Sequence, residues 1–203
     1  MSNAAPGGRF LTGSTMGHVI RMTVTGSIGV TFLFLVDAAN LFWVSLLGEE
    51  RLISALGFAW TIQFFSVSFG IGMMIAATAT VSRLIGSGNR TEARLQTTVC
   101  AAAAFLLQLI VTIFGLYYRH EILALAGATG ETAALAARYL VISMPSLPVM
   151  ALGMVGSAVL RAEGDAYRAM MITLASGLIS MVIDPLLIFG LGLGLDGAAL
   201  AVV

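Results

Sequence analysis

The sequence is poor in charge. Only 10% of its 203 residues are charged, lysine is absent, and ten arginines balance ten acidic residues. Ordinary soluble domains carry about 25% charged residues, so water is not expected to be the main solvent of this chain. The balanced charge also provides no field that would attract nucleic acid. We therefore expect a lipid bilayer, and no nucleic acid, as the partner of most of the surface.

Signatures of catalysis and of metal binding are also missing from the sequence. The single Cys100 excludes a disulfide framework within the chain and any clustered thiolate site. The two histidines, His18 and His120, are far apart, and no glycine-rich phosphate loop of the Walker type occurs. The sequence predicts neither an enzyme nor a cofactor, and it offers no certain metal site.

Long apolar runs are what the sequence has in abundance, because 59% of its residues are hydrophobic. A membrane helix needs about 20 mostly apolar residues. Five segments reach this length and a sixth is begun: 20–47, 52–82, 96–118, 134–160, 169–190, and a run from 194. The pattern predicts an all-α, polytopic transmembrane helical bundle over residues 16–203, preceded by a cytoplasmic tail at 1–15.

The two ends of the sequence carry expectations of their own. The start lacks a short apolar region followed by a small-residue cleavage site, so we expect no removable signal peptide. The final run, GLGLDGAALAVV, is apolar to the last residue. We therefore expect a truncated chain whose sixth helix is incomplete.

The placement of arginine predicts an orientation, because cytoplasmic loops of membrane proteins hold an excess of positive residues. If the amino terminus is cytoplasmic, more arginines lie on the cytoplasmic side than on the external side. The cytoplasmic set comprises Arg9, Arg21, Arg83, Arg90, Arg94, Arg161 and Arg168, and the external set Arg51, Arg119 and Arg138. We predict a multi-pass protein of the bacterial inner membrane with a cytoplasmic amino terminus.

Two acidic residues, Asp37 in FLFLVDAANLF and Asp184 in SMVIDPLLIFG, lie deep in apolar sequence. A charge at the bilayer centre costs about 2.5 to 3.5 kcal/mol on insertion scales, so such residues usually serve a function. At 1.5 Å per residue they lie about 25 Å and 22 Å along segments that enter from the same side. Similar depth permits a joint site in the outer half of the membrane but does not show contact.

Other polar residues share the first segment with Asp37. Asn40 lies about 60° from Asp37 around a helix, and Thr23, Ser27 and Thr31 extend the same polar stripe. This face either lines water or packs small hydroxyl residues against neighbouring helices. We interpret Asp37 itself as functional.

Prolines predict where the later segments deform. Asp184 followed by Pro185 is typical of a helix start, with the carboxylate as cap, so the fifth segment is expected to break there. Such capping is compatible with binding, since discontinuous helices often form transporter sites. Pro145 and Pro148 are expected to bend the fourth segment and provide a hinge. Glycines in FGIGM predict a tilt or bend in the second segment.

Two further polar residues have alternative interpretations. Tyr139 is either an aromatic anchor at the membrane interface or a hydrogen-bond partner for the carboxylates. Gln63, a lone amide in the second segment, forms either an interhelical hydrogen bond or part of a cavity. Both alternatives stay open at the level of sequence.

Four motifs together resemble the multidrug and toxic compound extrusion (MATE) family of transporters. FLVDAANLFWVSLLGEERLISALGFA is similar to the first-helix region of that family, and VSRLIGSGNRTEAR to its second-to-third helix loop. YLVISMPSLPVMALGMVGSAVLRAEGD is similar to its fourth helix and IDPLLIFGLGLGLDGAALA to its fifth-to-sixth helix passage. The resemblance covers nearly all of residues 16–203 but only the first of two six-helix lobes. A carboxy-terminal lobe is therefore expected in the complete, twelve-helix protein.

The resemblance implies an antiporter that exports amphipathic or cationic compounds in exchange for protons or sodium ions. It also implies a cation-coupling site formed by Asp37, Asp184 and Tyr139, with Ser180 and Val202 at positions where the family has Asn and Thr. Ser180 offers one hydroxyl and Val202 offers no oxygen, so a full shell of hard oxygen ligands for sodium is in doubt.

Two rival functions remain at this level. A related flippase for lipid-linked saccharides would need cationic residues for an anionic headgroup, whereas the polar face here is acidic and hydroxylic. A membrane scaffold that transports nothing would gain nothing from two buried carboxylates.

Overall fold

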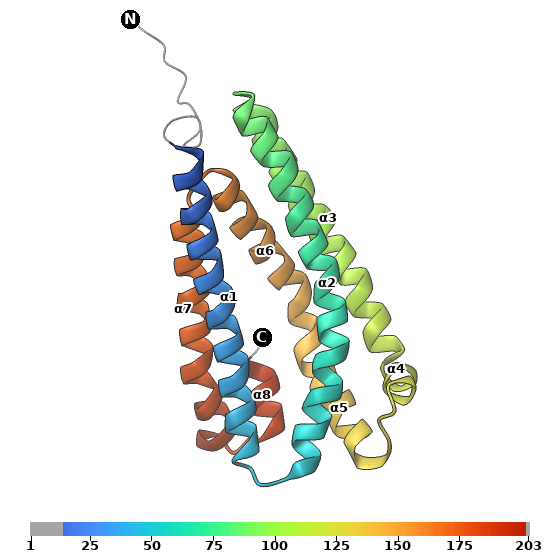
Figure 1. The fold of residues 1–203 in the computed structure, drawn as a ribbon. Helices are drawn as coiled ribbons and strands as arrows, with labels where there is room; N and C mark the ends of the chain where they lie inside the picture. Colours follow the sequence, from blue (N-terminus) through green and yellow to red (C-terminus); the bar gives the residue numbers. More distant parts are fainter. Residues whose placement is uncertain (1–13, 202–203) are drawn as a thin grey trace, which may run out of the picture.

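The computed structural model describes residues 14–201, and within that range every regular element is helical (Figure 1). The helices are α1 (Thr15–Ser45), α2 (Glu50–Gly86), α3 (Arg90–Tyr117), α4 (Arg119–Leu125), α5 (Gly130–Ser143), α6 (Leu147–Ala162), α7 (Ala166–Pro185) and α8 (Leu195–Ala201). A 3-10 turn, η2 (Met144–Ser146), joins α5 to α6, and a π-helical turn, η3 (Leu186–Gly190), follows α7. The all-α prediction is confirmed.

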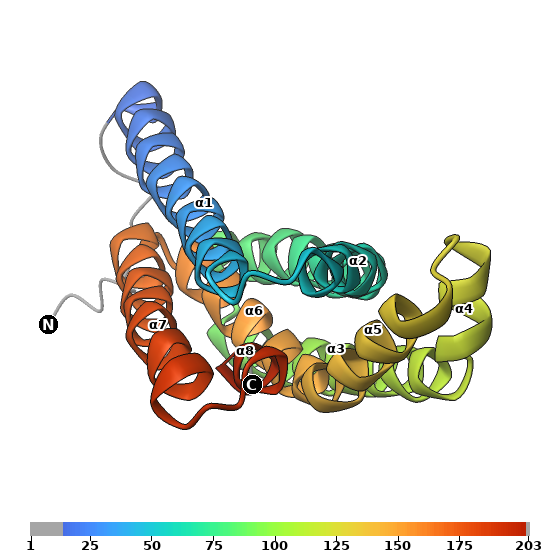
Figure 2. The ribbon, with the colours of Figure 1, turned by 90° about the horizontal axis from the view of Figure 1, so that it is seen from below.

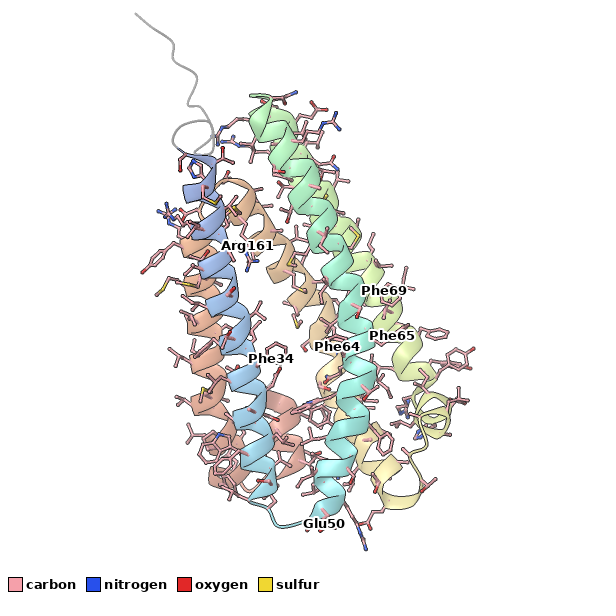
Figure 3. All side chains as sticks on the ribbon, in the orientation of Figure 1. Phe34, Glu50, Phe64, Phe65, Phe69 and Arg161 are labelled. Carbon is pink, nitrogen blue, oxygen red and sulfur yellow. The ribbon has the colours of Figure 1, made fainter. Side chains whose placement is uncertain are left out.

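Five helical stretches are long and apolar enough to cross a membrane: Thr15–Ser45, Glu50–Gly86, Arg90–Tyr117, Gly130–Ala162 and Ala166–Gly190. Large apolar side chains cover their outer surfaces. Phe34 on α1 and the neighbouring pair Phe64 and Phe65 on α2 are each about 70% exposed (Figure 3). Water would disfavour such a surface and lipid tails would not, so the five stretches form a membrane-embedded bundle.

Local chemistry explains where several helices begin. Ser14, Asn89 and Asp165 each accept a hydrogen bond from a backbone N–H of the following first turn, at 3.0, 3.2 and 3.3 Å. These caps satisfy N–H groups that a helix leaves unpaired at its start. Between α2 and α3, Gly88 has a φ of +79°, a conformation that glycine adopts at little cost.

The helices form two groups that meet at one end of the lobe. Helices α1 and α7 pack along each other, and α2, α3 and α6 form the second group, as Figure 2 shows. Gly177 allows the close approach of α7 to α1, since a Cβ there would lie 2.6 Å from a ring carbon of Phe32. Helix α8 contacts α5, α7 and α1, and it therefore joins the two groups.

The largest core cluster lies where α8 joins the two groups. Its fully buried side chains include Leu56 of α2, Tyr139 and Leu140 of α5, and Ile188 of the π-helical turn. Two smaller clusters continue along α2, α3 and α6 toward the other end. The best-packed part of the lobe therefore surrounds Tyr139.

The fourth and second segments behave differently at their predicted bends. The 3-10 turn interrupts the fourth segment at Pro145, and Pro148 begins α6 without an N–H to donate. The Met144 carbonyl instead accepts from the Leu147 N–H and, at 3.5 Å, from the Thr112 hydroxyl of α3. Helix α2 is one unbroken helix through FGIGM, although its axis changes direction along its length in Figure 1.

Arginine divides between the two ends of the bundle. Arg21, Arg83, Arg90, Arg94, Arg161 and Arg168 lie at the end that holds the start of α1 and the α2–α3 connection. Arg51, Arg119 and Arg138 lie at the opposite end, where Arg51 pairs with Glu131 and Arg138 with Asp196. Arg9 lies outside the described residues.

Candidate functional site

The centre of the candidate site is a hydrogen bond between α1 and α7. The Asn40 side-chain amide donates to the Asp184 carboxylate, with 3.2 Å between Nδ2 and Oδ2. Asp184 is 1% exposed and Asn40 5% exposed. A carboxylate held so deeply, with one neutral partner, is expensive to keep charged in the bilayer. The arrangement is suited to a group that binds a proton or a cation.

Tyr139 of α5 belongs to the same core cluster as Ile188, which follows Asp184 by four residues in the π-helical turn. Its side chain is completely buried in the largest core cluster, against which Trp60 also packs. The phenol is therefore part of the lobe interior and not an anchor at the membrane surface. The interpretation as an interfacial anchor is therefore wrong, and a hydrogen bond from Tyr139 to a carboxylate, which is not formed among the described residues, stays a prediction.

Asp37 occupies a different environment from Asp184. It lies on an exposed part of α1, one helical turn before Asn40. Across residues 14–201 it makes no hydrogen bond or ion pair, and so the two carboxylates are not directly bonded in this conformation. Asn40 is hydrogen-bonded to Asp184 and lies three residues after Asp37 on the same face of α1. It therefore lies between the two acidic residues in the structure.

Three buried polar atoms in this part of the lobe have no hydrogen-bond partner among residues 14–201: Asn40 Oδ1, Trp43 Nε1 and the Tyr139 hydroxyl. Leaving such a group unpaired costs about 1 to 3 kcal/mol, and in native structures these groups concentrate where function requires them. Sequence reasoning missed Trp43. Its position three residues after Asn40, on the same helix face, was the available signal.

The predicted helix start at Asp184 is wrong. Helix α7 runs through Asp184 to Pro185 and continues directly into the π-helical turn. The Asp184 carboxylate is occupied by the Asn40 side chain and caps no backbone N–H. Pro185 removes only one backbone hydrogen bond from the helix. The wider π-helical turn that follows relieves the clash between the proline ring and the preceding turn. Single π-helical turns of this kind are frequent at functional sites.

The remaining predicted residues fall at varying distances from this centre. Ser180 is half-buried on α7, one turn before Asp184, and forms no side-chain hydrogen bond in the described part of the chain. Val202, the position at which the resemblance places a threonine, lies outside the described residues.

Gln63 forms an interhelical hydrogen bond. Its amide donates to the Ser143 hydroxyl, with 2.7 Å between Nε2 and Oγ, and that hydroxyl donates in turn to the Tyr139 carbonyl at 2.8 Å. Gln63 thus ties α2 to the turn of α5 that carries Tyr139, immediately before Pro145. Of its two interpretations, the structure supports the interhelical bond.

A ligand set for a transition metal is not found among the described residues, since no three His, Cys, Asp or Glu side chains lie together. The hydrogen-bonded pair at the centre of the site offers the oxygens of Asp184 and Asn40. Oxygen atoms of this kind can bind a proton or a sodium ion. A sodium ion, however, prefers more oxygen ligands than this pair provides.

Comparison with known proteins gives consistent results. The model of the MatE family matches residues 24–186. The FAD transporter of Shewanella oneidensis is 30% identical over 196 residues, which cover 94% of this chain and 43% of the relative. The multidrug export protein MepA of Staphylococcus aureus is 30% identical over 175 residues, covering 85% and 38%.

Solved structures resemble the fold over almost its whole length. A MATE-family multidrug resistance transporter in an outward-facing conformation superposes with a TM-score of 0.90 at 26% identity, covering 97% of this chain and 44% of that one. A transporter of the MOP superfamily from Pyrococcus furiosus gives the same TM-score and identity, covering 97% and 43%. The chain therefore spans less than half the length of the proteins that it matches.

Proposed function

This chain belongs to the MatE family of transporters, and from that premise we propose that it forms the amino-terminal lobe of an antiporter for small molecules. The complete protein exports amphipathic or cationic compounds across the bacterial inner membrane in exchange for an ion. Members of the family are transporters and not enzymes, in line with the expectation from sequence. A second lobe, similar in length to this one, completes the transporter.

One observation carries the proposal: a fully buried carboxylate, Asp184, is held by the neutral side-chain amide of Asn40. A scaffold has no use for such a group, because its insertion cost brings no packing advantage. An ion-coupled transporter needs a group that exchanges its charge state or its ion during the cycle. Asp184 meets that need, and Asn40 orients it.

A second candidate cargo follows from the relative named as an FAD transporter. A flavin dinucleotide carries a negatively charged diphosphate, and a lipid-linked saccharide is anionic as well. Both would be repelled by the buried Asp184 and by Asp37 on α1. We therefore favour a neutral or cationic cargo, and an efflux assay with a cationic dye and with FAD distinguishes the two.

We propose the proton as the coupling ion. By residue type, Ser180 supplies one hydroxyl oxygen and Val202 no side-chain oxygen, which is too few for a sodium ion with its several hard ligands. A carboxylate alone can carry a proton. In everted vesicles that hold a two-lobed transporter with this lobe, the exporter should drive dye into the lumen on an imposed pH gradient without sodium. A strict requirement for sodium would count against proton coupling.

We further propose that the arginine-rich end of the bundle faces the cytoplasm. Gly88 and Asp165 lie at that end, and Glu50 and Gly127 at the other. In a Cys100→Ala background, a cysteine at 50 or 127 should react with an impermeant thiol reagent applied outside intact cells. Cysteines at 88 and 165 should react only after the cells are opened. Labelling of position 88 from outside would reverse the topology.

A further inference from the structure

A cavity at the arginine-rich end of the bundle lies far from the Asp184 site. It has a volume of about 320 Å³ and is formed by the end of α2, the start of α3 and the end of α6. Its polar lining consists of Arg90, Arg94, Thr97, Thr98 and Glu163. We refer to it as the arginine cavity.

The two arginines of the arginine cavity point to an anionic ligand. Arg90 and Arg94 are four residues apart on α3, so their side chains leave the same helix face about 5 to 6 Å apart. Guanidinium groups in such an arrangement match the oxygens of a phosphate. The hydroxyls of Thr97 and Thr98 follow one turn deeper, although both already donate to backbone carbonyls of α3.

The charge of this cavity is only partly compensated. Arg90 lies 3.9 Å from the Glu163 carboxylate, at the outer limit of an ion pair, and both side chains are nearly half exposed. Such a pair contributes little and an incoming anion can compete with it. Arg94 makes no ion pair within the described residues, and the nearby Glu92 is bonded to Asn89. Two positive charges therefore face one negative charge.

The position of the arginine cavity identifies the source of the anion. Helix α2 has 37 residues and is about 55 Å long, whereas a bilayer with its headgroups is about 40 to 45 Å thick. The end of α2 and the start of α3 therefore reach headgroup level. Val81, Ile85 and Val159 form an apolar wall of the cavity. A polar rim above apolar walls fits a lipid with a charged headgroup.

We propose that the arginine cavity binds the phosphate-bearing headgroup of an anionic phospholipid. The phosphate lies between Arg90 and Arg94, the threonines line the glycerol region, and the acyl chains run along the apolar wall into the bilayer. Basic pockets between helix ends commonly hold such headgroups. The bound lipid fixes the α2–α3 connection against α6.

The test measures lipid retention by native mass spectrometry on the full chain in a neutral detergent. The chain is offered equal amounts of phosphatidylglycerol and phosphatidylcholine. We expect preferential retention of one phosphatidylglycerol, and about thirtyfold weaker retention by the R90Q/R94Q variant, given the contribution of each arginine near a membrane surface. The matched control, R21Q/R83Q, removes two exposed arginines from the same end that do not line the cavity and should retain the lipid.

A gain of binding completes the test. Glu163→Gln removes the competing carboxylate and should strengthen phosphatidylglycerol retention severalfold, a result that misfolding cannot produce. Equal losses in R90Q/R94Q and R21Q/R83Q would reduce the effect to general surface charge and overturn the site. Complete displacement of the lipid by excess inorganic phosphate would identify a free anion as the ligand. Unchanged retention in R90Q/R94Q would overturn the proposal outright.

Discussion

Replacing Asp184 with asparagine is expected to abolish ion-driven efflux in a two-lobed transporter that carries this lobe. Asparagine has nearly the same shape, and its carbonyl can still accept the hydrogen bond from Asn40. The variant should therefore insert and fold, but it can neither take up nor release a proton. Dye uptake into everted vesicles under a pH gradient should fall to the level of vesicles without transporter, while the amount of protein in the membrane stays near normal.

Asp37→Asn should have the same effect, and the double variant should be scarcely worse than either single one. Residues that act as a unit give effects that do not add. The control is Asp196→Asn, which removes an acidic side chain from α8. The ion pair of Asp196 with Arg138 contributes little to stability. This control should retain efflux. Wild-type efflux and pH dependence in Asp37→Asn would show that Asp37 is not part of the coupling site and is only structural.

Gly197→Ala is expected to destabilise the lobe by about 3 kcal/mol, because overpacking against immobile atoms forces the backbone to shift. A Cβ at Gly197 would lie 2.7 Å from the carbonyl carbon and oxygen of Leu187 and 2.9 Å from the Ile188 nitrogen. These are backbone atoms of the π-helical turn that follows Asp184, so no side chain can move aside. The free energy of unfolding can be measured by sodium dodecyl sulfate titration in mixed micelles, followed by tryptophan fluorescence.

Gly153→Ala provides the matched control for this measurement. Gly153 lies within α6, and a Cβ there would meet nothing within 4 Å. Alanine should leave the stability unchanged or raise it by up to about 1 kcal/mol, because it restricts the unfolded chain. If Gly197→Ala proves as stable as Gly153→Ala, helix α8 does not pack on the π-helical turn in the manner described.

The sequence predicted the helical bundle and the family because both depend on local patterns. The length of an apolar run is visible without knowledge of neighbours, and so are the two acids that interrupt such runs at Asp37 and Asp184. The short helix α4 was missed because its seven residues lie outside any apolar run of membrane length.

The details of the site could not be predicted because they depend on which helix faces meet. The bond from Asn40 to Asp184 exists because Gly177 lets α1 approach α7, and no local pattern shows that approach. The same packing gives the Asp184 carboxylate a partner across the interface, so it does not act as the helix cap that the Asp-Pro pattern indicates. The exposure of Asp37 on α1 likewise results from the arrangement of whole helices.

The Asn40–Asp184 bond also determines an order of events during synthesis. Its partners are separated by 144 residues in the chain. A ribosome adds about 5 to 20 residues per second, so Asn40 is made about 7 to 30 seconds before Asp184. Throughout that interval, α1 lacks its packing partner α7, and Asn40 lacks the Asp184 carboxylate as a hydrogen-bond acceptor. Until the fifth membrane segment emerges, the Asp37 and Asn40 side chains of α1 therefore stay unpaired in the bilayer or at the insertion machinery. The apolar side chains of α1 must compensate for this cost.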